Sequence, residues 1–271
     1  MLASAFRARS RAAVLITSLA ILVCAPLSVA NAQGARAAAP WQNSATALIV
    51  DVRGENPLDF DALEEDRRIV GVMHKASEGL SSHAVEIYRA RRAEAKKRGY
   101  LWGSYHVLTR SDPRAQVALY VGQLGAPADE VMAIEVQCLG SVTTCPDPNY
   151  AVTPDDLAAA MLRIKELTGR FPLVSVNHAS MRVLDRRFGR IPELDGAKLW
   201  YPRYKDDISG VFPKGYWGQY ALWRFSSAIN CSAEQHAAGA CPYQAPGTDH
   251  AAGISVYFGP RDQLRRTWPA L

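Results

Sequence analysis

Two polar side chains lie at the end of one apolar segment, where they could take part in catalysis. Residues 131–137 read VMAIEVQ, so four apolar residues lead to Glu135 and Gln137. Because successive side chains of a β-strand point to opposite faces, a strand here would direct both polar residues to the same side. A carboxyl group can transfer a proton, whereas the amide of a glutamine cannot. The pair predicts a polar site in which one of two neighbouring positions cannot act as an acid or a base.

Other polar residues follow apolar segments at points where the parallel strands of a barrel would end. In a β/α barrel the carboxyl ends of the strands meet at one mouth, and catalytic groups come from several strands. We therefore expect the polar residues at these strand ends to converge. The candidates are Asp51, Lys75, Glu78, Tyr105, His106, Glu135, Gln137, Asn177, Tyr204 and Arg224.

Each candidate also has an ordinary structural explanation. A lone aspartate at a strand end commonly caps a turn or a helix, which is the alternative for Asp51. A lone histidine such as His106 is more often a hydrogen-bonded structural residue. Trp200 and Trp223 can pack in the core or at a rim instead of forming a surface for sugars. The joint occurrence of these candidate residues at successive strand ends favours a role in binding or catalysis.

Strands and helices alternate through the first two thirds of the chain, which indicates a parallel sheet. The last third is rich in strands, which indicates an incomplete ring of helices. The predicted fold class is α/β, a modified TIM-like β/α barrel with fewer helices than strands. Strands are predicted over residues 47–52, 69–76, 100–108, 131–137, 173–177, 198–204, 221–227 and 254–258, and helices over 61–68, 83–98, 112–123, 153–167 and 261–268.

The N-terminus has the pattern of a secretory signal peptide. Three arginines precede an apolar run over residues 12–27, and small residues before Gln33 suit cleavage after Ala32. The run is shorter than the roughly 20 residues of a membrane span, so no stable membrane anchor is expected after cleavage. We expect a signal peptide over 1–32, a flexible lead-in over 33–44 and one barrel domain over 45–271. The expected location is the bacterial periplasm or the extracellular space.

Four of the five cysteines lie beyond this leader, and an even number in an exported protein indicates disulfides. Three pairings are possible. The simplest joins neighbours, Cys138 with Cys145 and Cys231 with Cys241, because each bond would close a short loop. The cysteine and histidine spacing is not that of a zinc site, and no metal is expected.

The charge pattern does not favour nucleic acid as a partner. The formal net charge of +5 includes the three leader arginines, and without them it is +2. Beyond the leader, the sequence has no block of lysine and arginine interleaved with aromatic residues. We therefore expect no binding of nucleic acid.

Six short motifs, in this order, resemble those of glycoside hydrolase family 25. They are residues 49–52 (IVDV), 75–79 (KASEG), 103–107 (GSYHV), 133–137 (AIEVQ), 199–204 (LWYPRY) and 222–227 (LWRFSS). The family contains lysozyme-like muramidases, which cut peptidoglycan between N-acetylmuramic acid and N-acetylglucosamine. The resemblance covers nearly the whole chain beyond the leader and implies the same modified barrel.

The resemblance also implies roles for particular residues. Asp51 matches the conserved aspartate that ends the family's first strand. The fourth strand of the family ends in an aspartate and, two residues later, the glutamate that acts as general acid; here these positions hold Glu135 and Gln137. Gly253 aligns with a further aspartate near the C-terminus. The residues expected to bind substrate are Lys75, Glu78, Tyr105, His106, Asn177, Trp200, Tyr204, Trp223 and Arg224.

The expected function is that of an exported, muramidase-like protein that acts on or binds the glycan strands of peptidoglycan. General acid catalysis contributes ~10²–10⁴-fold to such reactions, and Gln137 cannot supply it. Two alternatives follow. Glu135, paired with Asp51, serves as the acid, or the protein is a cell-wall glycan-binding protein without catalysis. No cofactor is expected in either case.

Overall fold

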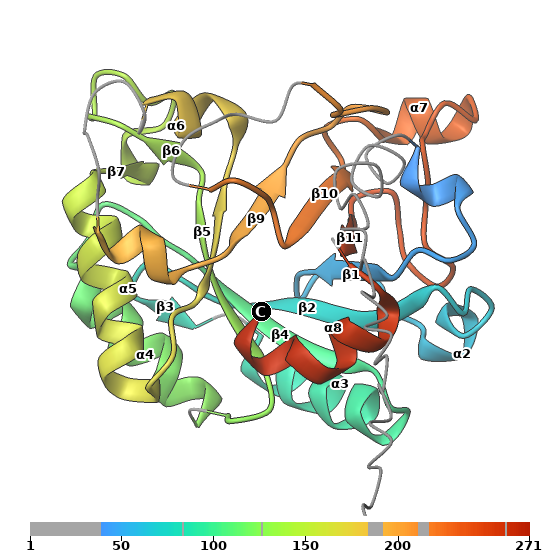
Figure 1. Ribbon diagram of the computed structural model, residues 1–271, viewed down its shortest axis with the longest axis horizontal. Helices are drawn as coiled ribbons and strands as arrows, with labels where there is room; N and C mark the ends of the chain where they lie inside the picture. The colour runs from blue at the N-terminus through green and yellow to red at the C-terminus, as the bar shows by residue number, and fades with distance from the viewer. Residues whose placement is uncertain (1–38, 83, 126, 184–191, 211–216, 258) are drawn as a thin grey trace, which may run out of the picture.

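Eight strands close into a barrel (Figure 1). Their order around the ring is β1, β11, β10, β9, β8, β5, β4 and β2, and β2 pairs with β1 to complete it. The strands are β1 (Leu48–Val52), β2 (Ile69–Glu78), β4 (Leu101–Val107), β5 (Val131–Val136), β8 (Leu173–Val176), β9 (Leu199–Pro202), β10 (Leu222–Ser226) and β11 (Gly253–Tyr257). The short β3 (Ser81–Ser82) pairs with β2 outside the ring, and β6 (Cys138–Leu139) pairs with β7 (Ala151–Val152) in a separate ribbon.

This computed structural model describes residues 39–82, 84–125, 127–183, 192–210, 217–257 and 259–271. The predicted signal peptide and residues 33–38 of the predicted lead-in lie outside these ranges. Within the rest of the lead-in, the 3-10 helix η1 (Pro40–Gln42) packs on the barrel, where the ring of Trp41 stacks on Phe225 at 5.1 Å between centroids. Contacts with the barrel therefore begin before the predicted boundary at residue 45.

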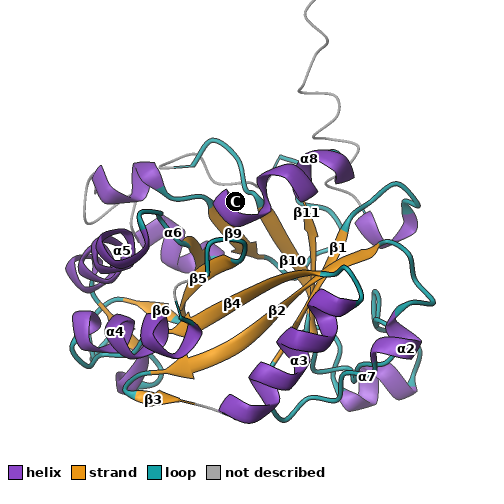
Figure 2. Cartoon of the chain, turned by 90° about the horizontal axis from the view of Figure 1, so that it is seen from below, coloured by secondary structure: helices purple, strands orange, loops and turns teal. Residues whose placement is uncertain are grey.

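The longer helices lie outside the strands of the first half of the chain (Figure 2). Proline and capping residues begin two of them: Asp112 caps α4, and Thr153 forms a capping box with Asp156 at α5. The α-helices are α2 (Phe60–Leu63), α3 (Val85–Lys97), α4 (Pro113–Leu124), α5 (Pro154–Thr168), α6 (His178–Val183), α7 (Ala233–Ala237) and α8 (Arg261–Thr267), and the further 3-10 helices are η2 (Pro148–Tyr150), η4 (Pro192–Gly196) and η5 (Trp268–Ala270).

Apolar side chains fill both faces of the barrel wall. One cluster lies inside the ring and the other lies between the ring and the helices, as the alternation of side chains along each strand requires. In β5, for example, Ala133 belongs to the inner cluster and Ile134 to the outer one. The C-terminal segment closes the lower end of the barrel, because Trp268 joins the inner cluster and its Nε1 donates to the Trp102 carbonyl at 2.7 Å.

The predicted fold class is confirmed, and most element boundaries agree to within two residues. The prediction of a helix over residues 61–68 is wrong after Leu63, where turns lead directly into β2. The helices α6 and α7 are not predicted from the sequence, because with six and five residues they are too short to show a clear apolar period. The ring is parallel except at β11, which runs antiparallel to both of its neighbours.

Two disulfides join neighbouring cysteines, Cys138 with Cys145 and Cys231 with Cys241, so the simplest of the three predicted pairings is confirmed. Each closes a short loop, of seven and ten residues in sequence separation. Among the described residues, none of the helices combines the length and the apolar character that crossing a membrane requires.

Loss of the second disulfide should destabilise the fold. Replacing Cys231 and Cys241 together by alanine should lower the free energy of unfolding by about 2–4 kcal/mol, because the unfolded chain gains the freedom that the closed loop removes. Urea denaturation of this double variant and of the oxidised wild-type protein measures the difference. A second double variant, with Cys138 and Cys145 replaced by alanine, is the comparison for loss of the other disulfide. A change within about 0.5 kcal/mol, typical of surface substitutions, would contradict the prediction.

Candidate functional site

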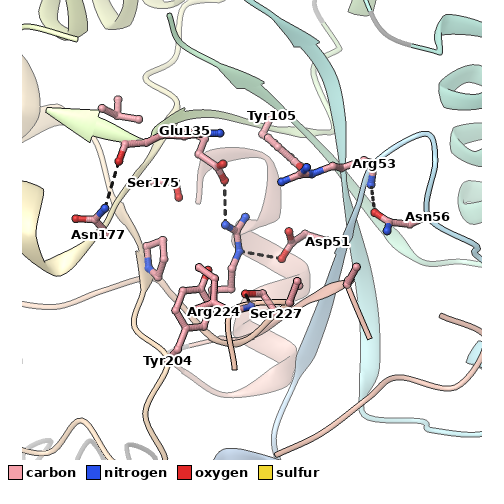
Figure 3. Close-up of a pocket in the computed structure, with 17 residues that line it drawn as sticks. Asp51, Arg53, Asn56, Tyr105, Glu135, Ser175, Asn177, Tyr204, Arg224 and Ser227 are labelled. Atoms are coloured by element: carbon pink, nitrogen blue, oxygen red, sulfur yellow. Dashed lines mark hydrogen bonds and ion pairs between the residues drawn. The ribbon is translucent and has the colours of Figure 1, made fainter. Parts of the chain in front are cut away.

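Strand alternation carries polar side chains to the upper mouth of the barrel. Apolar residues of β1, β5 and β10 pack inside the ring. Two positions further along the same strands, the same side of each strand carries Asp51, Glu135 and Arg224. These three residues and their neighbours line a pocket of about 370 Å³ at the carboxyl ends of the parallel strands (Figure 3). This is the end at which β/α barrels place their active sites.

Arg224 joins the two carboxylates across the mouth. Its Nε donates to Asp51 Oδ2 at 3.0 Å, and its Nη1 donates to Glu135 Oε2 at 2.9 Å (Figure 3). Arg224 is 6% exposed and Asp51 is 7% exposed, so bulk water screens this network only weakly. Three strands that are far apart in sequence are thus linked by one guanidinium group.

The side chain of Arg224 rests on an aromatic ring. Its guanidinium carbon lies 4.0 Å from the centroid of the Trp200 ring, a cation–π arrangement. Trp200 is fully buried, and its Nε1 donates to Ser255 Oγ at 2.9 Å. The tryptophan therefore forms a fixed floor beneath the guanidinium.

A glycine makes room for the carboxylate of Asp51. In the antiparallel pair of β1 and β11, Gly253 lies directly opposite Asp51. A Cβ atom on residue 253 would lie 2.0 Å from Asp51 Oδ2, which is far inside van der Waals contact. Any larger residue at position 253 would therefore require the side chain of Asp51 to move.

Burial raises the pKa of Asp51 to about 6, from an ordinary value near 3.8. The positive charge of Arg224 acts in the opposite direction, and the negative charge of Glu135 raises the pKa further. Asp51 is therefore mainly ionised at pH 7 and takes up a proton as the pH falls through about 6. Burial and the same two carboxylates also raise the pKa of Tyr105, so its hydroxyl stays protonated.

Gln137 lies just beyond the end of β5, where its exposed side chain borders the pocket that Glu135 also lines. The backbone carbonyl of Gln137 accepts a hydrogen bond from Asn177 Nδ2 at 3.3 Å (Figure 3). The disulfide from Cys138 follows immediately. The structure thus brings Glu135 and Gln137 to one cavity. The other predicted residues that line it are Tyr105, Asn177, Tyr204 and Arg224.

His106 does not reach the pocket, so the prediction that it binds substrate is corrected. The side chains of Tyr105 and His106 point to opposite faces of β4, and His106 is fully buried on the helix side. Its Nδ1 is 2.8 Å from Ser77 Oγ and its Nε2 is 3.1 Å from Gln116 Oε1. It is the hydrogen-bonded structural histidine that the sequence analysis held as the alternative.

The two tryptophans predicted to bind sugar are also buried. Trp200 lies beneath Arg224 inside the barrel, and Trp223 lies in the outer core with its Nε1 donating to the Arg203 carbonyl at 2.7 Å. Both are 0% exposed, so neither can offer a ring to a ligand in this structure. Packing, the alternative for tryptophans in a sheet, explains both.

Lys75 and Glu78 lie near the end of β2 but outside the lining of the pocket. The Lys75 ammonium group forms a salt bridge with Glu78, and Tyr150 donates its hydroxyl to Glu78 Oε1 at 2.6 Å. These contacts join β2 to the segment after the Cys138–Cys145 loop. Lys75 and Glu78 therefore lie outside the lining of the pocket that holds Asp51, and their binding of substrate stays a prediction.

Several residues of the pocket are not among those predicted from the sequence. Ser175 faces it from β8, and its buried Oγ has no hydrogen-bond partner among the described residues. It stands two positions before Asn177, so strand alternation could have identified it. Arg53 and Asn56 come from the turn after β1, and Ile229, 72% exposed, comes from the loop after β10; the sequence gives no signal for residues that irregular segments contribute.

The arrangement suits the binding of a polar, largely uncharged ligand. The described lining offers amide, hydroxyl and guanidinium groups, while its two carboxylates are already bound to Arg224. In the described part of the chain, histidine, cysteine and acidic side chains form no group of three or more that could hold a metal ion.

Comparison with known proteins gives a match in structure. No protein-family model and no curated protein matches the sequence. A bacterial lysozyme from Streptomyces coelicolor matches with a TM-score of 0.65 and 12% identity, over 84% of this chain and 99% of that one. A family GH25 lysozyme from Aspergillus fumigatus matches with a TM-score of 0.59 and 19% identity, over 82% and 99%.

A third structure, the modular autolysin LytC from Streptococcus pneumoniae in complex with a synthetic peptidoglycan ligand, matches with a TM-score of 0.57 and 12% identity. The match covers 79% of this chain and 47% of the autolysin. At these identities the likeness establishes the fold. The chain has the fold of the family 25 lysozymes.

Proposed function

We propose that this protein is an exported, divergent member of glycoside hydrolase family 25 that binds the glycan strands of peptidoglycan at the barrel mouth, with its hydrolytic activity lost or strongly reduced. The observation that carries this proposal is the state of the acidic groups. Among the described residues that line the pocket, Asp51 and Glu135 are the only carboxyl groups, and both are bound to Arg224.

The shared fold and the polar lining support a glycan as the ligand. Amino sugars present hydroxyl and acetamido groups, which need hydrogen-bond donors and acceptors together with some apolar surface. The side chains of Gln137, Asn177 and Tyr204 offer such groups from three different segments, and Ile229 adds apolar surface at the rim. One protein of the same fold has been seen with a peptidoglycan ligand.

The lining argues against efficient hydrolysis. Cleavage of a glycosidic bond needs a carboxylic acid that protonates the leaving oxygen and a second group that supports the cationic centre. By the sequence resemblance, Gln137 stands where the acid should be, and an amide cannot deliver a proton. Glu135 Oε2 accepts a hydrogen bond from Arg224 Nη1 at 2.9 Å, so this carboxyl group is already engaged in an ion pair.

A second candidate function, slow hydrolysis, is favoured by one observation. The pKa of Asp51 is raised to about 6, so this carboxyl group carries a proton in mildly acidic conditions. A protonated Asp51 beside a second carboxyl group, that of Glu135, gives the pair of acidic residues that glycosidases use. In this alternative, Asp51 or Glu135 replaces the missing acid.

Export to the periplasm or the extracellular space is part of the proposal. Disulfides form and persist in oxidising compartments and are rare in the cytosol, and this chain has two. The charged and apolar leader at residues 1–32 provides the matching signal in the sequence.

Glycan binding should depend on the pocket. Purified protein should co-sediment with peptidoglycan sacculi, and Tyr204→Ala should weaken this binding about tenfold, since the loss of one aromatic contact worth about 1.4 kcal/mol has that effect. Tyr100→Ala is the matched control, because Tyr100 packs on the outer core beside β4, outside the lining of the pocket. Equal binding by both variants, or no binding by the wild-type protein, would refute the proposed site.

Hydrolysis should be weak or absent. Release of reducing ends from peptidoglycan should be at least ~10²-fold slower than release by an active family 25 muramidase in a parallel assay, because a general acid contributes at least that factor. The slow-hydrolysis alternative predicts instead a measurable rate that rises as the pH falls through about 6, where Asp51 becomes protonated. Asp51→Asn and Glu135→Gln should both abolish such a rate, and rapid release at neutral pH would reject the binding proposal.

A further inference from the structure

Arg224 is placed so that it serves both carboxylates of the pocket at once. Its Nε and Nη1 atoms reach Asp51 and Glu135 at 3.0 and 2.9 Å, one from each side of the barrel mouth. An arginine presents its donors in a rigid planar fork, so the two contacts fix the positions of both acidic groups relative to each other. A lysine could place only a single ammonium group between them.

The surroundings hold the guanidinium in this position. Its face rests on Trp200, which is itself tied to Ser255 by a hydrogen bond. The backbone of β10 shifts register against β11 between Arg224 and Ser226, and the Arg224 carbonyl accepts a hydrogen bond from Arg203 N at 3.0 Å. The opposing Gly253 leaves the space that the carboxylate of Asp51 occupies.

Electrostatics indicates what this arrangement does to the acidic pair. Two buried carboxylates near one another repel, and without a cation one of them would keep its proton to higher pH. Burial and the charge of Glu135 raise the pKa of Asp51, and Arg224 opposes both effects. The other ionisable groups near the network are Arg53 and Tyr105, which interact with the carboxylates, and Tyr204, which interacts with Arg224. Glu55 lies 4.0 Å from Arg53 at the surface.

We propose that Arg224 is a positioning residue whose guanidinium group bridges Asp51 and Glu135 and keeps both engaged in ion pairs, so that the pocket receives a glycan without delivering a proton to it. This inference deepens the proposed binding function and rests on it for its biological meaning. It adds a second obstacle to hydrolysis that is independent of Gln137, because it concerns the two carboxyl groups that remain.

Titration of the two carboxyl groups tests this assignment directly. Carbon-13 NMR of protein labelled at aspartate and glutamate carboxyl groups, assigned with Asp51→Asn and Glu135→Gln, follows both groups between pH 4 and pH 9. In Arg224→Gln the midpoint of at least one of them should move upward by about 1–3 pH units, the range that a neighbouring opposite charge produces. One carboxyl group would then remain protonated at neutral pH.

Two further variants separate the bridge from simple loss of charge. Arg53→Gln removes one positive charge from the same pocket lining, but Arg53 has no salt bridge with either carboxylate in the structure, so its effect should be clearly smaller. Arg224→Lys keeps the charge but not the fork, so the upward movement should be intermediate. Near-ultraviolet circular dichroism checks that each variant is folded, and Arg224→Lys supplies the measurement if Arg224→Gln does not fold.

The proposal is overturned if both midpoints in the folded Arg224 variants stay at their wild-type values, or if Arg53→Gln moves them as far. Because the titration uses no glycan, its outcome is separate from that of the co-sedimentation assay. Failure of the wild-type protein to bind peptidoglycan would reject the proposed function and leave the electrostatic role of Arg224 standing.

Discussion

The closure of the eight-stranded ring is the constraint on which the rest of the structure depends. A closed ring fixes the direction of every side chain, because one face of each strand must pack inside and the other must meet the helices. The inner apolar layer supports Trp200, and Trp200 supports Arg224. The polar mouth is therefore the layer that follows directly on the apolar interior of the barrel.

The sequence predicted the strands well because each is a short apolar run bounded by turns or helices. In GSYHV, residues 103–107, both Tyr105 and His106 are polar, and only the packing of the closed barrel decides which of them faces the interior. The prediction consequently took both for site residues, although Gln116 and Ser77 hold His106 on the outer side. Alternation gives opposite faces, but it does not say which face is the inner one.

The bridge from Arg224 could not have been predicted, because its partners come from β1 and β5. Asp51 and Arg224 are separated by 173 residues, and no local pattern indicates that their side chains meet. The significance of Gly253, which aligns with an acidic position of family 25, likewise could not be predicted from the local sequence. Its meaning depends on the register of β1 against β11, which places that residue against the carboxylate of Asp51. Gln137, Arg224 and Gly253 thus line one pocket, although they lie far apart in the sequence.

The antiparallel strand β11 joins the two ends of the described chain, and this has a consequence for how the protein folds. β11 pairs with both β1 and β10, so the ring stays open until residues 253–257 have been added. Until then β1 has an unpaired edge, which is prone to wrong pairing, and contacts between such distant segments form slowly. The pocket is completed in the same step, since Gly253 lies against Asp51, so the site and the barrel mature together.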